Sequence, residues 1–199
     1  MLSNETIEKG MNYESYRNHI KSLLSKNQTT GTVQSPELVA FTQLNEQRMN
    51  RNEKQFHIND HLSNVLKTVT TNEIWIVFVE AWCGDCAQNI PILQKIAEHS
   101  NQKISLRYLI KSENMDTFRN YLSNGSEAIP KLIRFDASTL KELGTWGARP
   151  FPAQQIAENW KKNKATIPKE AFEKELHLWY GRDKGQTLQN EISKLIKVT

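Results

Sequence analysis

The sequence of 199 residues contains no long apolar run, few glycines and prolines, and only two cysteines. Because about 18 consecutive apolar residues are needed to cross a bilayer, a transmembrane helix is excluded. The N-terminal residues also lack the apolar segment of a secretory signal. Eight glycines and six prolines fall well below the roughly 12% share of these residues in average proteins. This scarcity favours long helices over a β-sandwich with many turns.

The two cysteines, Cys83 and Cys86, are three positions apart. This number and spacing exclude a structural disulfide framework and a zinc site with four cysteines from one chain. Without a secretory signal we expect a cytoplasmic protein. In that compartment a vicinal cysteine pair is more often redox-active than structural.

Charge and motifs exclude several classes of function. Lys and Arg number 26 against 22 Asp and Glu, an excess too small to indicate nucleic-acid binding. No Walker loop, GxGxxG or GxSxG pattern is present. We expect no bound cofactor; the small charge excess and the lack of a long apolar run predict no nucleic-acid partner and no membrane partner. Glu53, His57 and His61 are four apart, a spacing that fits a solvated helix face better than a metal site.

The first 72 residues have the periodicity of helices. Helices are expected over residues 13–27, over residues 36–52 with Ser35 as N-cap and Pro36 at the first position, and after Asn59 or Asp60. The side chains expected to face inward from the second helix are Leu38, Phe41, Leu44 and Met49. Since this segment has too few large apolar residues for its own core, we expect an N-terminal extension, 1–72, packed on the central part of the chain.

Residues 73–147 have the pattern of an α/β unit. The continuous run of β-branched and aromatic residues at 74–79 is typical of a strand buried on both faces. A helix from the cysteines to about residue 99 and a strand at 104–110 complete a βαβ unit, which implies a parallel pair. A short helix at 114–122 and a hairpin at 131–136 and 140–146 come next. The fold class is therefore α/β, a mixed sheet with helices on both faces.

Residues 148–199 return to helical patterns, at 154–161, 168–180 and 188–198. We expect them to form a C-terminal helical extension of the 73–147 core.

The motif Trp82-Cys83-Gly84-Asp85-Cys86 stands where the predicted strand gives way to the helix. Cys83 falls at the helix start, where free N–H groups and the helix dipole stabilise a thiolate. Cys86 lies one turn later on the same side and can attack a mixed disulfide formed on Cys83. Gly84 is expected to leave the approach to Cys83 open, and Trp82 to form a flat apolar wall. The alternatives are a chance motif, or half of a metal site shared by two chains.

Residues 78–93, FVEAWCGDCAQNIPIL, resemble the active-site segment of the thioredoxin family. Trp82, Cys83, Gly84 and Cys86 match the family's Trp-Cys-Gly-Pro-Cys motif, and the proline that kinks the helix after the motif is also matched, by Pro91. The resemblance covers about residues 73–147. It implies a thioredoxin-like fold with N- and C-terminal helical extensions, and Cys83 and Cys86 as the catalytic pair.

Ile129 and Pro130 resemble the family's cis-proline loop, which faces the cysteine motif and directly precedes a strand. The resemblance implies a cis bond between them. Cis geometry would free the backbone of Ile129 to pair with an extended substrate. Trp82, Ile129 and Pro130 are thus the expected substrate-binding residues.

Two departures from the family pattern stand out. Asp85 replaces the proline between the cysteines, where its charge is either a favourable element of the first helical turn or a modulator that opposes thiolate formation on both neighbours. Val77 occupies the position of the family's buried acid. Glu80 is close enough in sequence to replace that acid through water, although an exposed charge at the strand end is the expected role.

These features predict a thiol–disulfide oxidoreductase of thioredoxin type that reduces protein disulfides. Its partners would be those disulfides and an electron donor, either a reductase or glutathione. The alternative is a thioredoxin-fold module that binds proteins or senses redox state with little turnover, because the departures at Val77 and Asp85 touch the reactive pair.

Overall fold

The computed structural model describes residues 4–123 and 125–197. The strands are β1 (Glu73–Val79), β2 (Ile104–Ile110), β3 (Lys131–Asp136) and β4 (Glu142–Gly147). The helices are α1 (Asn4–Glu8), α2 (Tyr13–Leu24), α3 (Pro36–Gln55), α4 (Asp60–Leu66), α5 (Gly84–Glu98), α6 (Met115–Phe118), α7 (Phe151–Lys162), α8 (Lys169–Asp183) and α9 (Gln186–Lys197), with the 3-10 helices η1 (Lys111–Glu113) and η2 (Arg119–Tyr121) around α6. Val198, the expected end of the last helix, lies outside the described residues, as do the outermost residues of the expected extensions.

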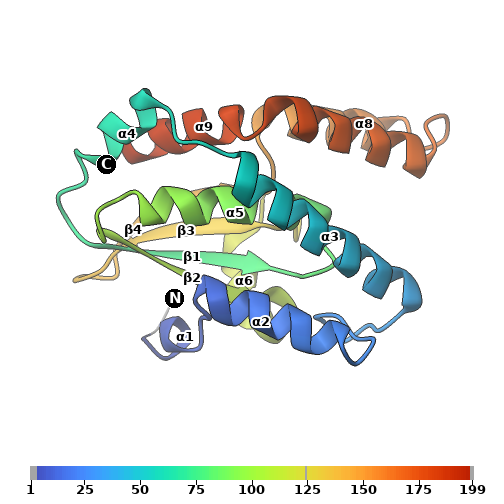
Figure 1. Ribbon diagram of the computed structural model, residues 1–199, viewed down its shortest axis with the longest axis horizontal. Helices are drawn as coiled ribbons and strands as arrows, with labels where there is room; N and C mark the ends of the chain where they lie inside the picture. The colour runs from blue at the N-terminus through green and yellow to red at the C-terminus, as the bar shows by residue number, and fades with distance from the viewer. Residues whose placement is uncertain (1–3, 124, 198–199) are drawn as a thin grey trace.

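The four strands form one mixed sheet in the order β2-β1-β3-β4. β1 runs parallel to β2 and antiparallel to β3, and β3 and β4 form the hairpin. Helices cover both faces (Figure 1), which confirms the predicted α/β class with a thioredoxin-like fold. Of the hairpin only β4 lies at the edge of the sheet, because β3 pairs with the free side of β1.

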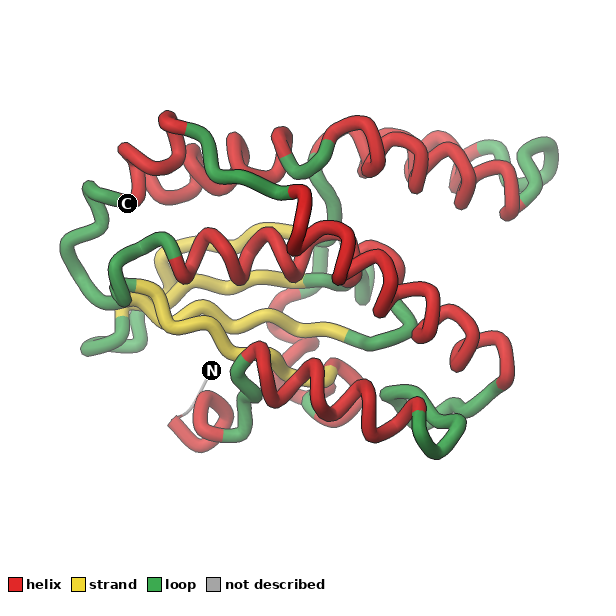
Figure 2. Tube along the Cα trace, in the orientation of Figure 1, coloured by secondary structure: helices red, strands yellow, loops and turns green. Residues whose placement is uncertain are grey.

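The core is built around β1 and α5. Residues 75–79 are fully buried, as the continuous apolar run predicts for a central strand. α5 lies on one face of the sheet with α9, and α6 lies on the other (Figures 1 and 2). Phe118 of α6 meets Phe78 edge-on, with ring centroids 5.2 Å apart.

No helix within 4–123 or 125–197 is long and apolar enough to span a bilayer.

The N-terminal helices share this core. The buried cluster that contains β1 also contains side chains from α2, α3 and α4, namely Tyr16, Ile20, Met49, Leu62, Val65 and Leu66. Met11 extends the sheet, since its N–H and C=O pair with Tyr108 of β2 at 2.9 and 2.8 Å. This bridge covers part of an edge that would otherwise present free backbone groups.

Helix α3 begins as predicted, with Ser35 as N-cap and Pro36 in the first turn. Of its predicted inward residues only Met49 is fully buried, and Leu44 was wrongly predicted. The buried side chains are Val39, Thr42, Asn45 and Met49, whereas Leu44 is 40% exposed. The buried face includes polar residues because each has a partner. Thr42 hydrogen bonds to Thr29 at 2.6 Å, and the Asn45 amide donates to the Ala81 carbonyl at 2.8 Å.

The predicted helix at 114–122 is shorter in the structure, where only α6 is α-helical and 3-10 turns flank it. The Asn120 amide donates to the carbonyls of Asp116 and Thr117. Such local bonds from asparagine compete with the regular helical pattern.

The C-terminal helices divide between two clusters. α9 joins the main core through Leu188, Ile192 and Ile196. α7 and α8 pack on each other in a second, smaller cluster, in which Trp160 stacks on Phe172 with ring centroids 4.6 Å apart.

Deleting residues 1–70 should expose the central core. The truncation removes Tyr16, Ile20, Met49, Phe56 and Leu62, each at most 2% exposed. At about 1.5 kcal/mol or more for each buried side chain, the loss is comparable with the whole stability of a typical domain, about 5–15 kcal/mol. We expect a much lower melting temperature and strong binding of an apolar dye.

Deletion of residues 1–9 alone is the control, because residues 5–9 are partly or fully exposed. A 71–199 chain as stable and soluble as the full chain would show that the N-terminal segment is a loose appendage.

Candidate active site

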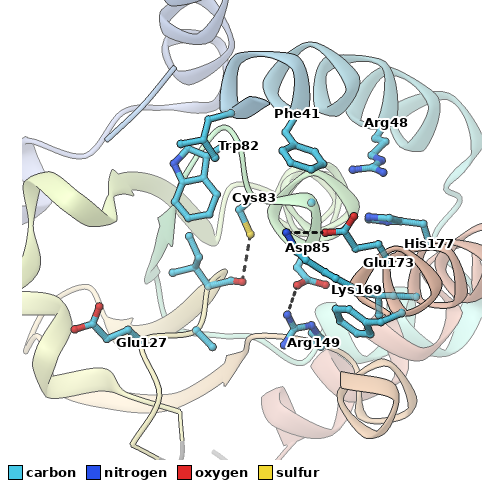
Figure 3. Close-up of a pocket in the computed structure, with 16 residues that line it drawn as sticks. Phe41, Arg48, Trp82, Cys83, Asp85, Glu127, Arg149, Lys169, Glu173 and His177 are labelled. Carbon is cyan, nitrogen blue, oxygen red and sulfur yellow. Dashed lines mark hydrogen bonds and ion pairs between the residues drawn. The ribbon is translucent and has the colours of Figure 1, made fainter. Parts of the chain in front are cut away.

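The cysteine motif lies at the junction of β1 and α5. Cys83 is the N-cap of α5, and its sulfur accepts a hydrogen bond from the Cys86 backbone N–H at 3.4 Å. Both cysteines are free thiols. The approach to Cys83 was expected to be open, but Cys83 is only 8% exposed, and Cys86 is 1% exposed. Side chains of α3 and α8 stand over the start of the helix and cover it (Figure 3).

The surroundings of Cys86 favour its neutral form. Burial raises the pKa of the Cys86 thiol well above its ordinary value, and the Cys83 sulfur raises it further. A hydrogen bond from the Glu80 backbone opposes the rise. Cys86 is therefore a protonated thiol at neutral pH, which suits a group that acts second.

The extension before β1 holds the loop in front of Cys83. Thr30 accepts a hydrogen bond from the Ala81 N–H and Asn45 donates to the Ala81 carbonyl, both at 2.8 Å. Pro91 in the middle of α5 has no N–H for the carbonyl four residues earlier. The Asn52 amide of α3 donates to that carbonyl, of Ala87, at 3.3 Å.

The loop of Ile129 and Pro130 faces the motif, and the bond between the two residues is cis. The Ile129 carbonyl accepts a hydrogen bond from the Cys83 thiol at 3.5 Å, so in the reduced protein it is already engaged. Pro130 is buried behind Ile129. Gly147, at φ +125°, packs against this loop, and a Cβ there would lie 2.2 Å from the Pro130 carbonyl oxygen.

A cavity of about 380 Å³ opens beside Cys83. Five of the predicted site residues line it: Trp82, Cys83, Gly84, Asp85 and Ile129. Cys86 and Pro130 lie outside the lining. The remaining walls come mainly from α3 and α8, and sequence reasoning missed them: Leu38, Phe41, Arg48, Phe172, Glu173, Leu176 and His177.

Asp85 was expected to be either a simple first-turn residue or an uncompensated charge between the thiols. In the structure it is 7% exposed, and its carboxylate pairs with Arg149 at 2.6 Å and accepts from the Tyr180 hydroxyl at 2.8 Å. Burial raises the pKa of the Asp85 carboxyl, while Arg149 and Tyr180 oppose the rise. Its charge is therefore largely balanced by Arg149. No spacing signal links Asp85 to Tyr180, 95 positions away.

Gly84 has a different role from the one expected. A Cβ on Gly84 would lie 3.0 Å from the His177 ring and 3.2 Å from the Arg48 guanidinium. The glycine therefore lets side chains of α8 and α3 approach the helix start, which narrows the path to Cys83 instead of opening it.

Glu80 was expected at the exposed strand end, and this was wrong. It is 1% exposed, and one carboxylate oxygen accepts from the Ser112 N–H at 2.8 Å. The other oxygen, Oε2, has no hydrogen-bond partner among the described residues. Glu80 also accepts, through its backbone carbonyl, the Cys83 N–H. A buried carboxylate thus stands next to the motif although Val77 is apolar.

Glu53, His57 and His61 do not share one helix, because α3 ends at Gln55. Glu53 instead hydrogen bonds to Tyr13 and Arg17. The described parts of the chain contain no group of three or more His, Cys, Asp or Glu arranged to hold a metal ion. Trp146 is a core residue whose indole donates to Glu191.

Comparisons with known proteins agree with this fold. A family model described as thioredoxin matches residues 31–161. Two solved structures match the whole chain at 17% identity: a Pseudomonas aeruginosa protein of unknown function, over 97% of its length with a TM-score of 0.58, and an HIV epitope scaffold, over 99% of its length with a TM-score of 0.60. At this identity the likeness shows the fold alone. No curated protein matches the chain.

Replacing Asp85 with Asn should destabilise the protein. The substitution leaves the Arg149 guanidinium, whose side chain is 18% exposed, without its carboxylate. Breaking a buried ion pair costs about 3–5 kcal/mol, and for this partly open pair we expect about 2–3 kcal/mol in urea unfolding. Asp116→Asn, at a fully exposed carboxylate, is the matched control and should change nothing measurable.

The double variant Asp85→Asn/Arg149→Met should recover part of that loss, since no charge is left unpaired. If Asp85→Asn alone were as stable as the wild type, the ion pair between Asp85 and Arg149 would not stabilise the start of α5.

His177 should make stability depend on pH. Burial, with Arg48 and Arg51 nearby, lowers the pKa of His177 to about 4 from 6.5. Between those values the unfolded chain binds a proton that the folded chain does not, so stability falls as pH falls. Allowing for solvent screening of the partly open ring, we expect the wild type to lose about 1–2 kcal/mol more than His177→Gln between about pH 7 and pH 4.

The exposed imidazole of His57 supplies the control, and His57→Gln should follow the wild-type curve. Equal pH dependence in the wild type and His177→Gln would contradict a neutral, buried His177.

Proposed function

Because the chain belongs to the thioredoxin family, we propose that it is a thiol–disulfide oxidoreductase that reduces disulfides through Cys83 and Cys86. The observation that supports this most is the placement of the pair. Cys83 caps α5 and lines the cavity, while Cys86 is sealed one turn behind it. The two thiols therefore have different access, as a nucleophile and a resolving group require.

The reaction has two exchange steps. The Cys83 thiolate attacks one sulfur of the substrate disulfide, forms a mixed disulfide and releases the first thiol. The helix start stabilises the attacking thiolate through its N–H groups and dipole. Cys86 loses its proton and attacks the Cys83 sulfur, which releases the second thiol and leaves a Cys83–Cys86 disulfide.

The other residues of the site hold the substrate and the pair. Trp82 and Ile129 form the walls of the cavity next to Cys83, and Pro130 supports Ile129 from behind. Asp85 ties the helix start to Arg149 and Tyr180, and Gly84 sets how closely α3 and α8 approach. Protein disulfides are the substrate class that the family resemblance implies, with a reductase or glutathione as the electron source in the cell.

A second candidate is a redox-sensing or protein-binding module with little turnover. The low exposure of both sulfurs favours it, since Cys83 is only 8% and Cys86 1% exposed. In such a module, oxidation of the two cysteines would change the state of the protein, and substrate disulfides would be reduced only slowly.

Single-turnover mass spectrometry separates the two. Pre-reduced protein is mixed with bis(2-hydroxyethyl) disulfide, a neutral small disulfide, and the protein mass is followed over time. We expect the wild type to lose two hydrogens, Cys86→Ser to stop as a mixed-disulfide adduct, and Cys83→Ser to stay unmodified. An adduct on Cys86 in the Cys83→Ser variant, formed at the wild-type rate, would reverse the two roles, and no reaction in the wild type would favour the sensing module.

A further inference from the structure

The cavity beside Cys83 is a recess between two helices and not an open surface. α3 contributes Leu38, Phe41 and Arg48, and α8 contributes Phe172, Leu176 and His177. The recess continues outward as a groove between the same helices, past Leu44 and Leu178. A space of about 380 Å³ is in the range of small-molecule sites. A sulfur that is 8% exposed beside such a recess is more accessible to a small disulfide than to a disulfide held on a folded protein surface.

Among the described residues that line the recess, every charged side chain except Arg48 forms an ion pair. Its three carboxylates, Asp85, Glu127 and Glu173, each form an ion pair, with Arg149, Lys111 and Lys169 respectively. Arg48 is half-buried, and no carboxylate of residues 4–123 and 125–197 lies within ion-pair distance of it. Its guanidinium donates to the Asn45 side chain at 2.9 Å. Since a guanidinium has five N–H donors, most of them remain for a ligand.

Arg48 also lies against Gly84, the residue that follows Cys83. Its guanidinium lies 3.2 Å from the position of a Cβ on Gly84, the residue next to Cys83. Figure 3 shows Arg48 and His177 on one side of the recess, with Phe41 between them and Trp82. The start of the 15-residue helix α5 adds partial positive charge at the same place. An anionic group bound at Arg48 would therefore lie in the same cavity as the Cys83 sulfur.

The remaining walls are apolar. Phe172 and Leu176 are buried, and Leu38 and Phe41 are partly buried. His177 does not add a second cation at neutral pH, because its pKa is lowered to about 4. One cation without an ion-pair partner among the described residues, next to apolar walls and a nucleophile, fits a short aliphatic chain that ends in a carboxylate.

We propose that the preferred substrate of this site is a low-molecular-weight disulfide that carries a carboxylate, held by Arg48 while Cys83 attacks its sulfur. This rests on the proposed oxidoreductase function and names its substrate class. One such disulfide, R–S–S–R, takes two electrons from the dithiol and leaves as two R–SH. The first R–S⁻ takes a proton from water, the second takes the proton that Cys86 gives up, and the protein ends with a Cys83–Cys86 disulfide.

The test compares three disulfides of similar size and different charge: 3,3′-dithiodipropionate, bis(2-hydroxyethyl) disulfide and cystamine, which are anionic, neutral and cationic. Pre-reduced protein reacts with each in single turnovers, and each rate is divided by the rate of the same disulfide with free dithiothreitol, which removes intrinsic reactivity. Insulin, treated the same way, represents protein disulfides. The variants are Arg48→Gln and, as a charge-matched control on the same helix, Lys54→Gln at an exposed site.

We expect the normalised rate to be highest for the anionic disulfide and lowest for cystamine and insulin. Arg48→Gln should slow the anionic disulfide about tenfold more than it slows the neutral one, which corresponds to about 1.4 kcal/mol. Lys54→Gln should leave all rates unchanged. Equal normalised rates for the three charges, equal slowing of all three by Arg48→Gln, or faster reduction of insulin would each overturn the proposal.

A second measurement separates this proposal from the function on which it rests. Calorimetric titration of Cys83→Ser with 3,3′-dithiodipropionate measures binding without chemistry, and Arg48→Gln in that background should weaken it about tenfold. If the wild type reduces no disulfide but this binding is present, the oxidoreductase function fails and the carboxylate site stands. If the neutral disulfide is reduced but no binding depends on Arg48, the function stands and the substrate class fails.

Discussion

Helix α5 is buried along most of its length, so the polar groups of its first turns must find partners inside the protein. Asp85, Gln88 and Asn89 are each at most 7% exposed. Arg149 and Tyr180 satisfy Asp85, and Tyr180 also accepts from the Asn89 amide. Gln88 accepts from Arg51 and Asn52 of α3 and meets His177 of α8. Since these partners belong to α3, α8 and the segment after β4, the helix that bears the cysteines determines how those elements are placed.

The same packing decides what can reach the thiols. Elements that satisfy the polar side of α5 also stand over its start, so Cys83 lies at the base of a recess and Cys86 behind it. The recess has apolar walls, paired carboxylates and the Arg48 guanidinium, which forms no ion pair with a described carboxylate. The narrow access to Cys83 and the charge of Arg48 together favour small anionic disulfides as substrates. The cysteine pair alone is compatible with many disulfides.

Much of the fold could be predicted from local patterns. The apolar run of β1 and the helix after it indicated a βαβ unit, and Ser35 before Pro36 indicated where α3 begins, because these signals lie within a few neighbouring residues. Wrong predictions arose where a partner lies far along the chain. The inward face of α3 includes Thr42 and Asn45 because Thr42 hydrogen bonds to Thr29 and Asn45 donates a hydrogen bond to the Ala81 carbonyl. Glu80 is buried because the Ser112 backbone donates to it.

The sequence by itself determined the chemistry and its position: two cysteines one helical turn apart, at the end of a central strand, with a proline loop before the next strand. Hydrophobic periodicity and helix-start geometry are local, so they can be recognised in one chain. The tertiary structure alone decided the surroundings. It paired Asp85 with Arg149, placed His177 and Arg48 against Gly84, and closed α8 over Cys83. Side chains that far apart in sequence meet only when the helices pack, and no periodicity records which of them will be neighbours.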